Sequence, residues 1–186
     1  VLGGEAESGV ATMERAAGLD TGDGVRRHAT PILDDDTGPA LWARLAERGA
    51  ALMVETLERL DDITPQPQDD AASTHAPMLK KTDGQLDWSW TAKRVHDRVR
   101  GVNPWPSGQT TLRGDLLKVH RTRLVSDVAP GAAEPGTVLA LTPRLLVACG
   151  DGVLEVIEAQ LPGKPRRPAR DIVNGARLQV GERLGG

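Results

Sequence analysis

Aromatic side chains and cysteine are scarce in this chain of 186 residues. Phenylalanine and tyrosine are absent, which leaves four tryptophans. The single cysteine, Cys149, excludes an internal disulfide and a cysteine-based zinc cluster. Because a chain without disulfides is typical of a reducing compartment, we expect a cytoplasmic protein.

Long apolar runs are lacking as well. No run approaches the roughly 18 residues that a membrane-spanning helix needs. The first seven residues show neither a basic start nor a hydrophobic stretch, so we expect no signal peptide and no membrane partner. Charged residues make up 26% of the chain and apolar residues 39%, which favours one or two folded domains over a disordered segment.

Charge of one sign is unevenly distributed. Residues 1–75 contain 6 Lys and Arg against 15 Asp and Glu, a net charge of −9. Residues 76–186 contain 17 against 11, a net charge of +6. An acidic front joined to a basic back indicates a nucleic-acid partner for the back half. Two ordinary domains with different surface charge give the same asymmetry, and charge alone leaves both interpretations open.

The first 60 residues predict two strands and a helix. Residues 8–16 and 25–32 have strand character, and the turn-rich residues 18–24 separate them. Thr37 is positioned to cap a helix that runs to about residue 60. Its expected buried stripe consists of Leu41, Trp42, Leu45, Leu52, Met53, Leu57 and Leu60. Such a unit needs more sheet beside it, so we expect an N-terminal region to precede it.

The rest of the chain predicts a linker and a small barrel. Residues 61–76 are rich in Pro, Gln, Asp and Ser, which indicates a linker or an extended arm. A short helix is expected at residues 90–102. Five short strands should follow, at residues 109–112, 116–124, 136–140, 145–148 and 153–160. Five strands within so short a stretch are typical of a five-stranded barrel such as the OB-fold.

Three familiar catalytic and nucleotide-binding motifs are absent. The sequence has no G-x-S-x-G, no P-loop and no dinucleotide fingerprint. Its four histidines lack metal-ligand spacing, so we expect no metal. The loop of residues 18–23 (GLDTGD) places two carboxylates between two predicted strands. Such a loop can hold an Asp against a neighbouring site, and it also suits an ordinary Asx-type turn.

Six segments, in chain order, resemble the motif pattern of the methionyl-tRNA formyltransferase family. They are residues 8–13 (SGVATM), 18–23 (GLDTGD), 75–80 (HAPMLK), 83–88 (DGQLDW), 100–106 (RGVNPWP) and 148–152 (ACGDG). Formyltetrahydrofolate dehydrogenase and sugar-nucleotide formyltransferases share the second and fifth of these. The chain departs from the family pattern at His75, Met78 and residues 107–108. The family's Asn-x-His pair and SLLP segment lie upstream of everything present here.

The resemblance implies an α/β fold in three parts. Residues 1–60 would be the C-terminal edge of a formyltransferase Rossmann-like catalytic domain, whose folate-binding N-terminal region is largely missing. Residues 61–87 would be a linker, and residues 88–186 an OB-fold-like C-terminal tRNA-binding domain. The expected molecule is a monomer.

The resemblance also implies an activity and a site. The family transfers a formyl group from 10-formyltetrahydrofolate to the amino group of methionyl initiator tRNA. Asp20 corresponds to its catalytic carboxylate, and Ala17, Gly18 and Leu19 to a loop that lines the folate pocket. Without the Asn-x-His pair, this chain alone is expected to be inactive. The alternatives are a sugar-nucleotide or other folate-dependent formyltransferase, and a stand-alone tRNA-binding module.

Basic residues of the back half are the expected tRNA contacts. Phosphate contacts from such residues give salt-dependent affinity without reading sequence. For each cation, a plain solvated surface role remains open. The candidate residues are Lys80, Lys81, Arg94, Arg98, Arg100, Lys118, Arg121, Arg123, Lys164, Arg166, Arg167 and Arg170. Trp88, Trp90 and Trp105 offer stacking surfaces, but we expect them to pack in the core.

Overall fold

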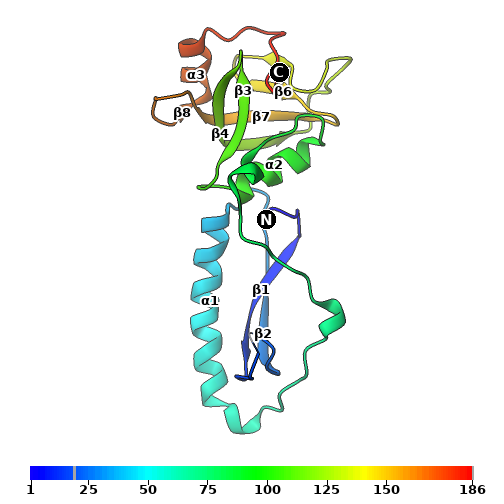
Figure 1. Ribbon diagram of the computed structural model, residues 1–186, viewed down its shortest axis with the longest axis vertical. Helices are drawn as coiled ribbons and strands as arrows, with labels where there is room; N and C mark the ends of the chain where they lie inside the picture. The colour runs from blue at the N-terminus through cyan, green and yellow to red at the C-terminus, as the bar shows by residue number, and fades with distance from the viewer. Residues whose placement is uncertain (19, 186) are drawn as a thin grey trace. The chain divides into compact units, whose positions relative to one another are not determined.

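The chain forms two compact units in a computed structural model that describes residues 1–18 and 20–185 (Figure 1). The first unit is Glu5–Met78. The second combines Val1–Gly4 with Leu79–Gly186. Helices and strands occur in both, so the fold is of mixed α/β type.

The first unit is a β-hairpin with one long helix alongside it (Figure 1). Strands β1 (Glu7–Met13) and β2 (Gly24–Pro31) pair antiparallel, with Glu7 opposite Pro31. Helix α1 (Gly38–Glu58) begins at the predicted cap, where the Thr37 hydroxyl accepts a hydrogen bond from the Ala40 N–H at 3.4 Å. Strand β1 ends before the predicted residue 16, because the pairing becomes irregular between Thr12 and Met13.

Helix α1 buries only part of its predicted stripe. Leu41 and Leu52 are buried and Leu45 is half-buried. The prediction is wrong for four further residues, since a two-stranded hairpin covers only one side of the helix. Their exposed fractions are 73% for Trp42, 49% for Met53, 64% for Leu57 and 52% for Leu60.

A buried hydroxyl pair fastens helix α1 to the hairpin. The Thr56 hydroxyl donates to the Leu52 carbonyl at 2.7 Å. Because its only proton is used there, Thr12 must donate to the Thr56 oxygen, 3.0 Å away. The Thr12 hydroxyl thus ties strand β1 to the helix through a satisfied polar contact.

The chain then returns along the hairpin. Two short 3₁₀ turns, η1 (Leu60–Asp62) and η2 (Asp70–Ala72), flank an extended segment of residues 63–69. Gln66 and Gly24 exchange two backbone hydrogen bonds of 2.7 Å each, so this segment adds a short third pairing beside the start of β2.

The second unit is built on a curled antiparallel sheet. Its strand order is β3-β4-β7-β6-β5, and β8 pairs with β7. Register shifts around Arg121 in β4 locally kink that strand, as β-bulges do. The bounds are β3 Gly108–Leu112, β4 Asp115–Val125, β5 Val138–Ala140, β6 Leu145–Ala148, β7 Val153–Gln160 and β8 Arg167–Pro168. The five predicted strands are all present, and β6 and β7 have the predicted bounds.

The end of the chain joins the two edges of this sheet. On the β5 side, Val138 donates to Glu182 at 2.8 Å and accepts from Gly181 at 2.9 Å. On the β3 side, Gly185 donates to Thr111 at 2.9 Å, and Leu184 pairs with Leu112. Residues 181–185 therefore act as a shared edge strand for β3 and β5.

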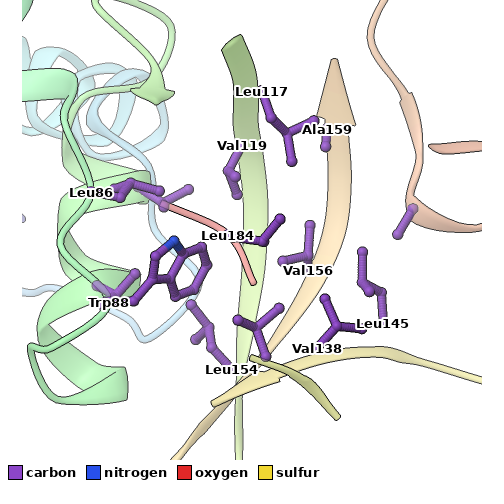
Figure 2. Close-up of a cluster of buried hydrophobic side chains, with 14 of the residues drawn as sticks. Leu86, Trp88, Leu117, Val119, Val138, Leu145, Leu154, Val156, Ala159 and Leu184 are labelled. Atoms are coloured by element: carbon purple, nitrogen blue, oxygen red, sulfur yellow. The ribbon is translucent and has the colours of Figure 1, made fainter. Parts of the chain in front are cut away.

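Helices cover the core of the second unit. Helix α2 (Ala92–Gly101) is capped by Thr91 and contributes the fully buried Val95 and Val99. Helix α3 (Ala169–Ala176), which the sequence analysis did not predict, contributes Ala169 and Ile172. Figure 2 shows the side chains of the sheet that meet in this core. They include Leu117, Val119, Val138, Leu145, Leu154, Val156 and Leu184.

The compact second unit begins at Leu79, whereas the predicted linker extends to residue 87. The 3₁₀ turn η3 (Lys81–Gly84) leads into Leu86, which is buried and donates its N–H to the Gln109 carbonyl at 2.8 Å. Trp88 is also buried, and its indole N–H donates to the Thr110 hydroxyl at 2.9 Å. Residues 79–87 therefore pack as part of the unit.

Candidate functional site

The turn between β1 and β2 carries the candidate catalytic carboxylate. Asp20 is exposed and has a left-handed backbone with φ of 55°. Ala17 and Gly18 are exposed just before it, while Leu19 lies outside the described residues. The structure thus keeps Asp20 next to the two described residues of the predicted folate loop.

Close backbone packing fixes the shape of this turn. The Glu14 N–H donates to the Asp23 carbonyl at 2.9 Å, which closes the hairpin. Gly22 is buried, and a Cβ placed on it would lie 1.7 Å from the Glu14 carbonyl oxygen. Only glycine fits this approach, which explains why the GLDTGD motif has a glycine there.

A hollow of about 740 Å³ opens beside the turn, within the first unit. Its walls come from both strands, from the turn itself and from the returning segment. Asp20, Arg26 and Arg27 bring charge to it, together with Asp69 and Asp70. The hollow therefore presents both signs of charge near the candidate carboxylate.

The family motifs of the second unit build structure rather than a reactive centre. In the ACGDG segment, the Gly150 N–H donates to the carbonyls of Trp88 at 2.8 Å and Trp90 at 2.9 Å. In the NPWP segment, the Asn103 side-chain amide donates to the His120 carbonyl at 2.8 Å. Burial raises the pKa of the Cys149 thiol to about 12, so this thiol is not a nucleophile at neutral pH.

Most of the candidate tRNA-contacting cations lie on the surface of the second unit. Arg98 and Lys118 are half-buried. Arg166 forms an ion pair with Glu158, and Arg123 lies 3.5 Å from Glu155. The exposed members are Lys80, Lys81, Arg94, Arg121, Arg123, Lys164, Arg166, Arg167 and Arg170.

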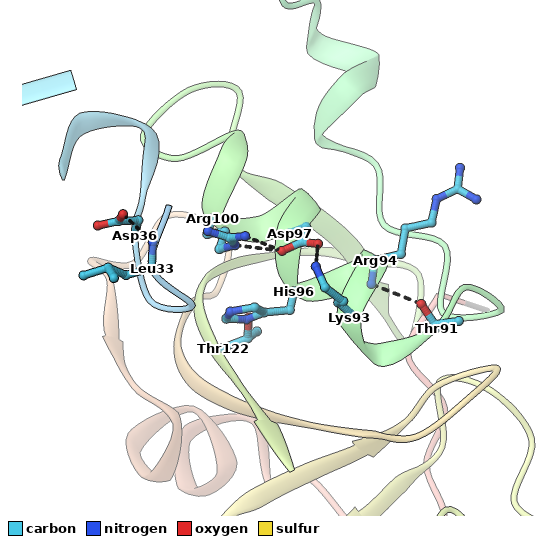
Figure 3. Close-up of polar contacts among 9 residues, drawn as sticks. All are labelled: Leu33, Asp36, Thr91, Lys93, Arg94, His96, Asp97, Arg100 and Thr122. Atoms are coloured by element: carbon cyan, nitrogen blue, oxygen red, sulfur yellow. Dashed lines mark hydrogen bonds and ion pairs between the residues drawn. The ribbon is translucent and has the colours of Figure 1, made fainter. Parts of the chain in front are cut away.

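Arg100 is the exception among these cations. Its side chain is 7% exposed, and its guanidinium binds Asp97 through contacts of 2.6 and 2.8 Å (Figure 3). Lys93 reaches the other oxygen of the same carboxylate at 2.6 Å. A phosphate cannot approach a guanidinium buried in this way, so Arg100 is removed from the candidate interface and braces helix α2 instead.

The three tryptophans considered as stacking surfaces occupy different environments. Trp88 is buried, as expected. Trp90 is half-buried, and the guanidinium carbons of Arg94 and Arg98 lie 4.2 and 5.2 Å from its ring centroid. Such stacking orders both arginines. Trp105 is 53% exposed, so the expectation of core packing is wrong for it.

Hydrogen bonds from His120 through Gln160 support the loop that carries Lys164. The Gln160 amide donates to the Lys164 carbonyl at 2.7 Å, so its oxygen is free to accept from His120 Nε2 at 3.0 Å. His120 therefore carries its proton on Nε2. Burial lowers the pKa of His120, and the positive charges of Arg166 and Lys118 lower it further, against the Gln160 hydrogen bond, which raises it.

Two contacts of the site have no signal in the sequence. The His120–Gln160 contact joins residues 40 positions apart, and Gln68 reaches the turn at Asp20 from 48 positions away. Glutamine has no characteristic spacing, so only the fold reveals them. Among the described residues, no group of three or more His, Cys, Asp or Glu is arranged to hold a metal ion. No described helix is long and apolar enough to cross a membrane.

Residues 78–177 match the model of the formyl transferase C-terminal domain family. The chain belongs to this family. The motifs at residues 83–88, 100–106 and 148–152 lie within this match. Together with the relative described next, the match confirms the resemblance inferred from the six motifs.

The chain is also similar, over its whole length, to part of a longer protein. It is 48% identical to a methionyl-tRNA formyltransferase of Solibacter usitatus over 187 residues, which cover 100% of this chain and 59% of that relative. The chain thus spans about three fifths of the length of the curated relative it matches.

Two solved structures share the formyl transferase fold. HypX from Aquifex aeolicus in complex with tetrahydrofolic acid gives a TM-score of 0.69 at 18% identity, over 97% of this chain and 32% of that one. An N-formyltransferase from Helicobacter canadensis, in complex with folinic acid and dTDP-3-aminofucose, gives 0.66 at 17% identity, over 83% and 57%. At these identities the likeness shows the fold alone.

Proposed function

We propose that this chain is the C-terminal part of a methionyl-tRNA formyltransferase. The observation that carries the proposal is the 48% identity over the whole chain to a relative of that name. The reaction is formyl transfer from 10-formyltetrahydrofolate to the amino group of methionyl initiator tRNA, which serves translation initiation.

The proposed domain plan is the one inferred from the sequence. Residues 1–60 would complete a Rossmann-like catalytic domain. Residues 61–87 would connect it to an OB-fold-like domain of residues 88–186, with residues 79–87 packed on that second domain. The exposed apolar side chains of helix α1, Trp42 and Leu57 among them, support the first assignment because a larger sheet would cover them. The curled sheet with joined edges supports the last.

Asp20 is the proposed catalytic group of this chain. In the reaction, the methionyl amine attacks the formyl carbon, and negative charge grows on the formyl oxygen. The Asn-x-His pair that would stabilise this charge belongs to the preceding region. Asp20 would orient that histidine and assist proton transfer as the amine loses a proton and the departing nitrogen gains one. Its exposed place at the hairpin turn leaves the carboxylate accessible.

Ala17, Gly18 and Leu19 are the proposed folate contacts of this chain. 10-Formyltetrahydrofolate supplies the formyl group, and no metal takes part in the proposed reaction. Ala17 and Gly18 are exposed close to Asp20, which leaves them accessible to a ligand. The tetrahydrofolic acid in the HypX structure supports a folate-derived donor for this fold.

The second unit is the proposed tRNA-binding part. Its exposed and half-buried cations supply phosphate contacts, whereas Arg100 does not belong to this set. Stacking on Trp90 orients Arg94 and Arg98, and the Gln160 amide anchors the backbone of Lys164.

A fusion protein tests the proposed function. In it, about the first two fifths of the Solibacter usitatus relative precede residues 1–186. We expect the fusion protein to formylate methionyl initiator tRNA, and the 186-residue chain alone to transfer no formyl group. A folded fusion protein that formylates only an amino sugar attached to a nucleotide would point to a sugar-nucleotide formyltransferase. One that binds tRNA without any transfer would point to a stand-alone binding module.

A further inference from the structure

Gln68 contacts the catalytic turn from the segment that the sequence assigns to a linker. Its side-chain amide nitrogen lies 2.8 Å from the Asp20 carbonyl oxygen and 2.6 Å from that of Gly22. A glutamine amide has two N–H donors, and both are used here on carbonyls separated by one residue. The side chain therefore spans the turn at Thr21.

The backbone next to Gln68 holds this side chain in register. Gln66 exchanges two 2.7 Å hydrogen bonds with Gly24, the first residue of β2. Asp23, the residue before β2, closes the turn through its carbonyl, so Gln68 starts from a fixed point on the same hairpin. The 63–69 segment thus presents the amide to the turn as a short paired strand would.

The conformation of Asp20 benefits from such support. A left-handed backbone is uncommon for a residue with a side chain, although Asp adopts it more readily than most, so contacts on both sides of the turn help to hold it. On one side, Gly22 is pinned against the Glu14 carbonyl. On the other side, the Asp20 peptide is held by Gln68. Loss of the amide would let the Asp20 peptide rotate and carry the carboxylate away from its direction.

We propose that Gln68 is a positioning residue for formyl transfer, acting through Asp20. The inference rests on the proposed catalytic role of Asp20. It also gives residues 63–69, which the sequence analysis assigned to a linker, a part in the reaction, since the peptide that aims the carboxylate is held from them.

Gln68→Glu tests this role with little change of shape. The variant replaces the donating nitrogen by an oxygen, which repels both carbonyls. Gln66→Glu is the matched control, because its side chain donates to Thr64 at 3.3 Å and not to the turn, while its paired backbone is unchanged. In the fusion protein, we expect Gln68→Glu to lower kcat at least about tenfold with little change in KM for either substrate. Gln66→Glu should keep the parent kcat.

A double variant separates positioning from general damage. In an Asp20→Asn background, Gln68→Glu should lower kcat no further, because the carboxylate it aims is already gone. A full additional loss there, or equal kcat for the two glutamine variants, would overturn the proposal.

Amide hydrogen exchange in the 186-residue chain gives a readout that needs no activity. Gln68→Glu should speed exchange of the residue 21–24 amides relative to Gln66→Glu. Equal exchange in both variants would show that Gln68 does not hold the turn. If the fusion protein is inactive but exchange responds as expected, the proposed function fails while the hold of Gln68 on the turn stands.

Discussion

Asp20 is the side chain on which the proposed chemistry most directly depends. In the fusion protein, Asp20→Asn keeps the size of the side chain and removes its charge, so the catalytic histidine loses its orienting partner. We expect kcat to fall at least about a hundredfold with an unchanged unfolding transition. Asp35→Asn, an exposed position after β2, is the control. A near wild-type rate for Asp20→Asn would remove this carboxylate from the mechanism.

His120 makes the stability of the second unit depend on pH. Its pKa is lowered in the folded state, chiefly by burial, so the unfolded chain binds its proton more readily. Stability is therefore lost as pH falls below about 6.5, the ordinary value for histidine. We expect His120→Gln to flatten the loss of unfolding free energy between pH 7.5 and 5.5, measured by urea titration. His75→Gln, at an exposed site, should keep the parent slope.

At the scale of elements, the turn at residues 148–152 (ACGDG) packs closely against the start of helix α2. A Cβ on Gly150 would lie 1.8 Å from the Ser89 carbonyl oxygen. The neighbouring Asp151 carbonyl accepts the Ala92 N–H at 2.7 Å, so the turn cannot move without breaking this contact. We expect Gly150→Ala to cost about 2–3 kcal/mol of unfolding free energy.

Gly175→Ala is the control for that prediction. It lies in helix α3, and nothing comes closer than 4.0 Å to its added Cβ. Alanine is the better helix former by up to about 1 kcal/mol, so this variant should be neutral or slightly stabilising. Chemical denaturation measures the unfolding free energy of both variants. A Gly150→Ala protein as stable as Gly175→Ala would contradict the close packing of Gly150 against the Ser89 carbonyl.

Local chemistry explains which elements the sequence predicts. Thr37 and Thr91 cap their helices, and the bounds of β6 and β7 follow from apolar runs between turns. Helix α3 is missed because it is one short element within a basic, proline-containing stretch. The exposure of Trp42 and Leu57 cannot be read from helical spacing, because burial depends on what lies opposite. In the same way, charge suggests Arg100 as a phosphate ligand, and only the fold shows that its guanidinium is buried against Asp97.

At the scale of the whole molecule, charge separation predicts salt-dependent tRNA binding. If about three or four cations of the second unit meet phosphates, affinity should fall roughly as the third power of salt concentration. Replacing Arg166, Arg167 and Arg170 together by Ala should flatten that slope by about two to three units. The change should be similar for initiator and elongator tRNA, because phosphate contacts carry no sequence information.

Filter-binding titrations of the 186-residue chain at several salt concentrations measure this slope. The control replaces three other arginines, Arg144, Arg177 and Arg183, which removes the same charge outside the proposed interface. Two of them already pair with acids, Arg144 with Asp127 and Arg183 with Glu134. Binding that is absent at low salt, or equal slopes for the two triple variants, would contradict the proposed interface.

Residues 181–185, the shared edge strand of the second unit, come late in the order in which a ribosome makes the chain. Until they emerge, β3 and β5 each have an unpaired row of backbone groups. Open edges of this kind invite pairing with other nascent chains. The basic unit therefore cannot complete its sheet before residue 185 has been made, and a chain truncated shortly before that point would keep both edges open.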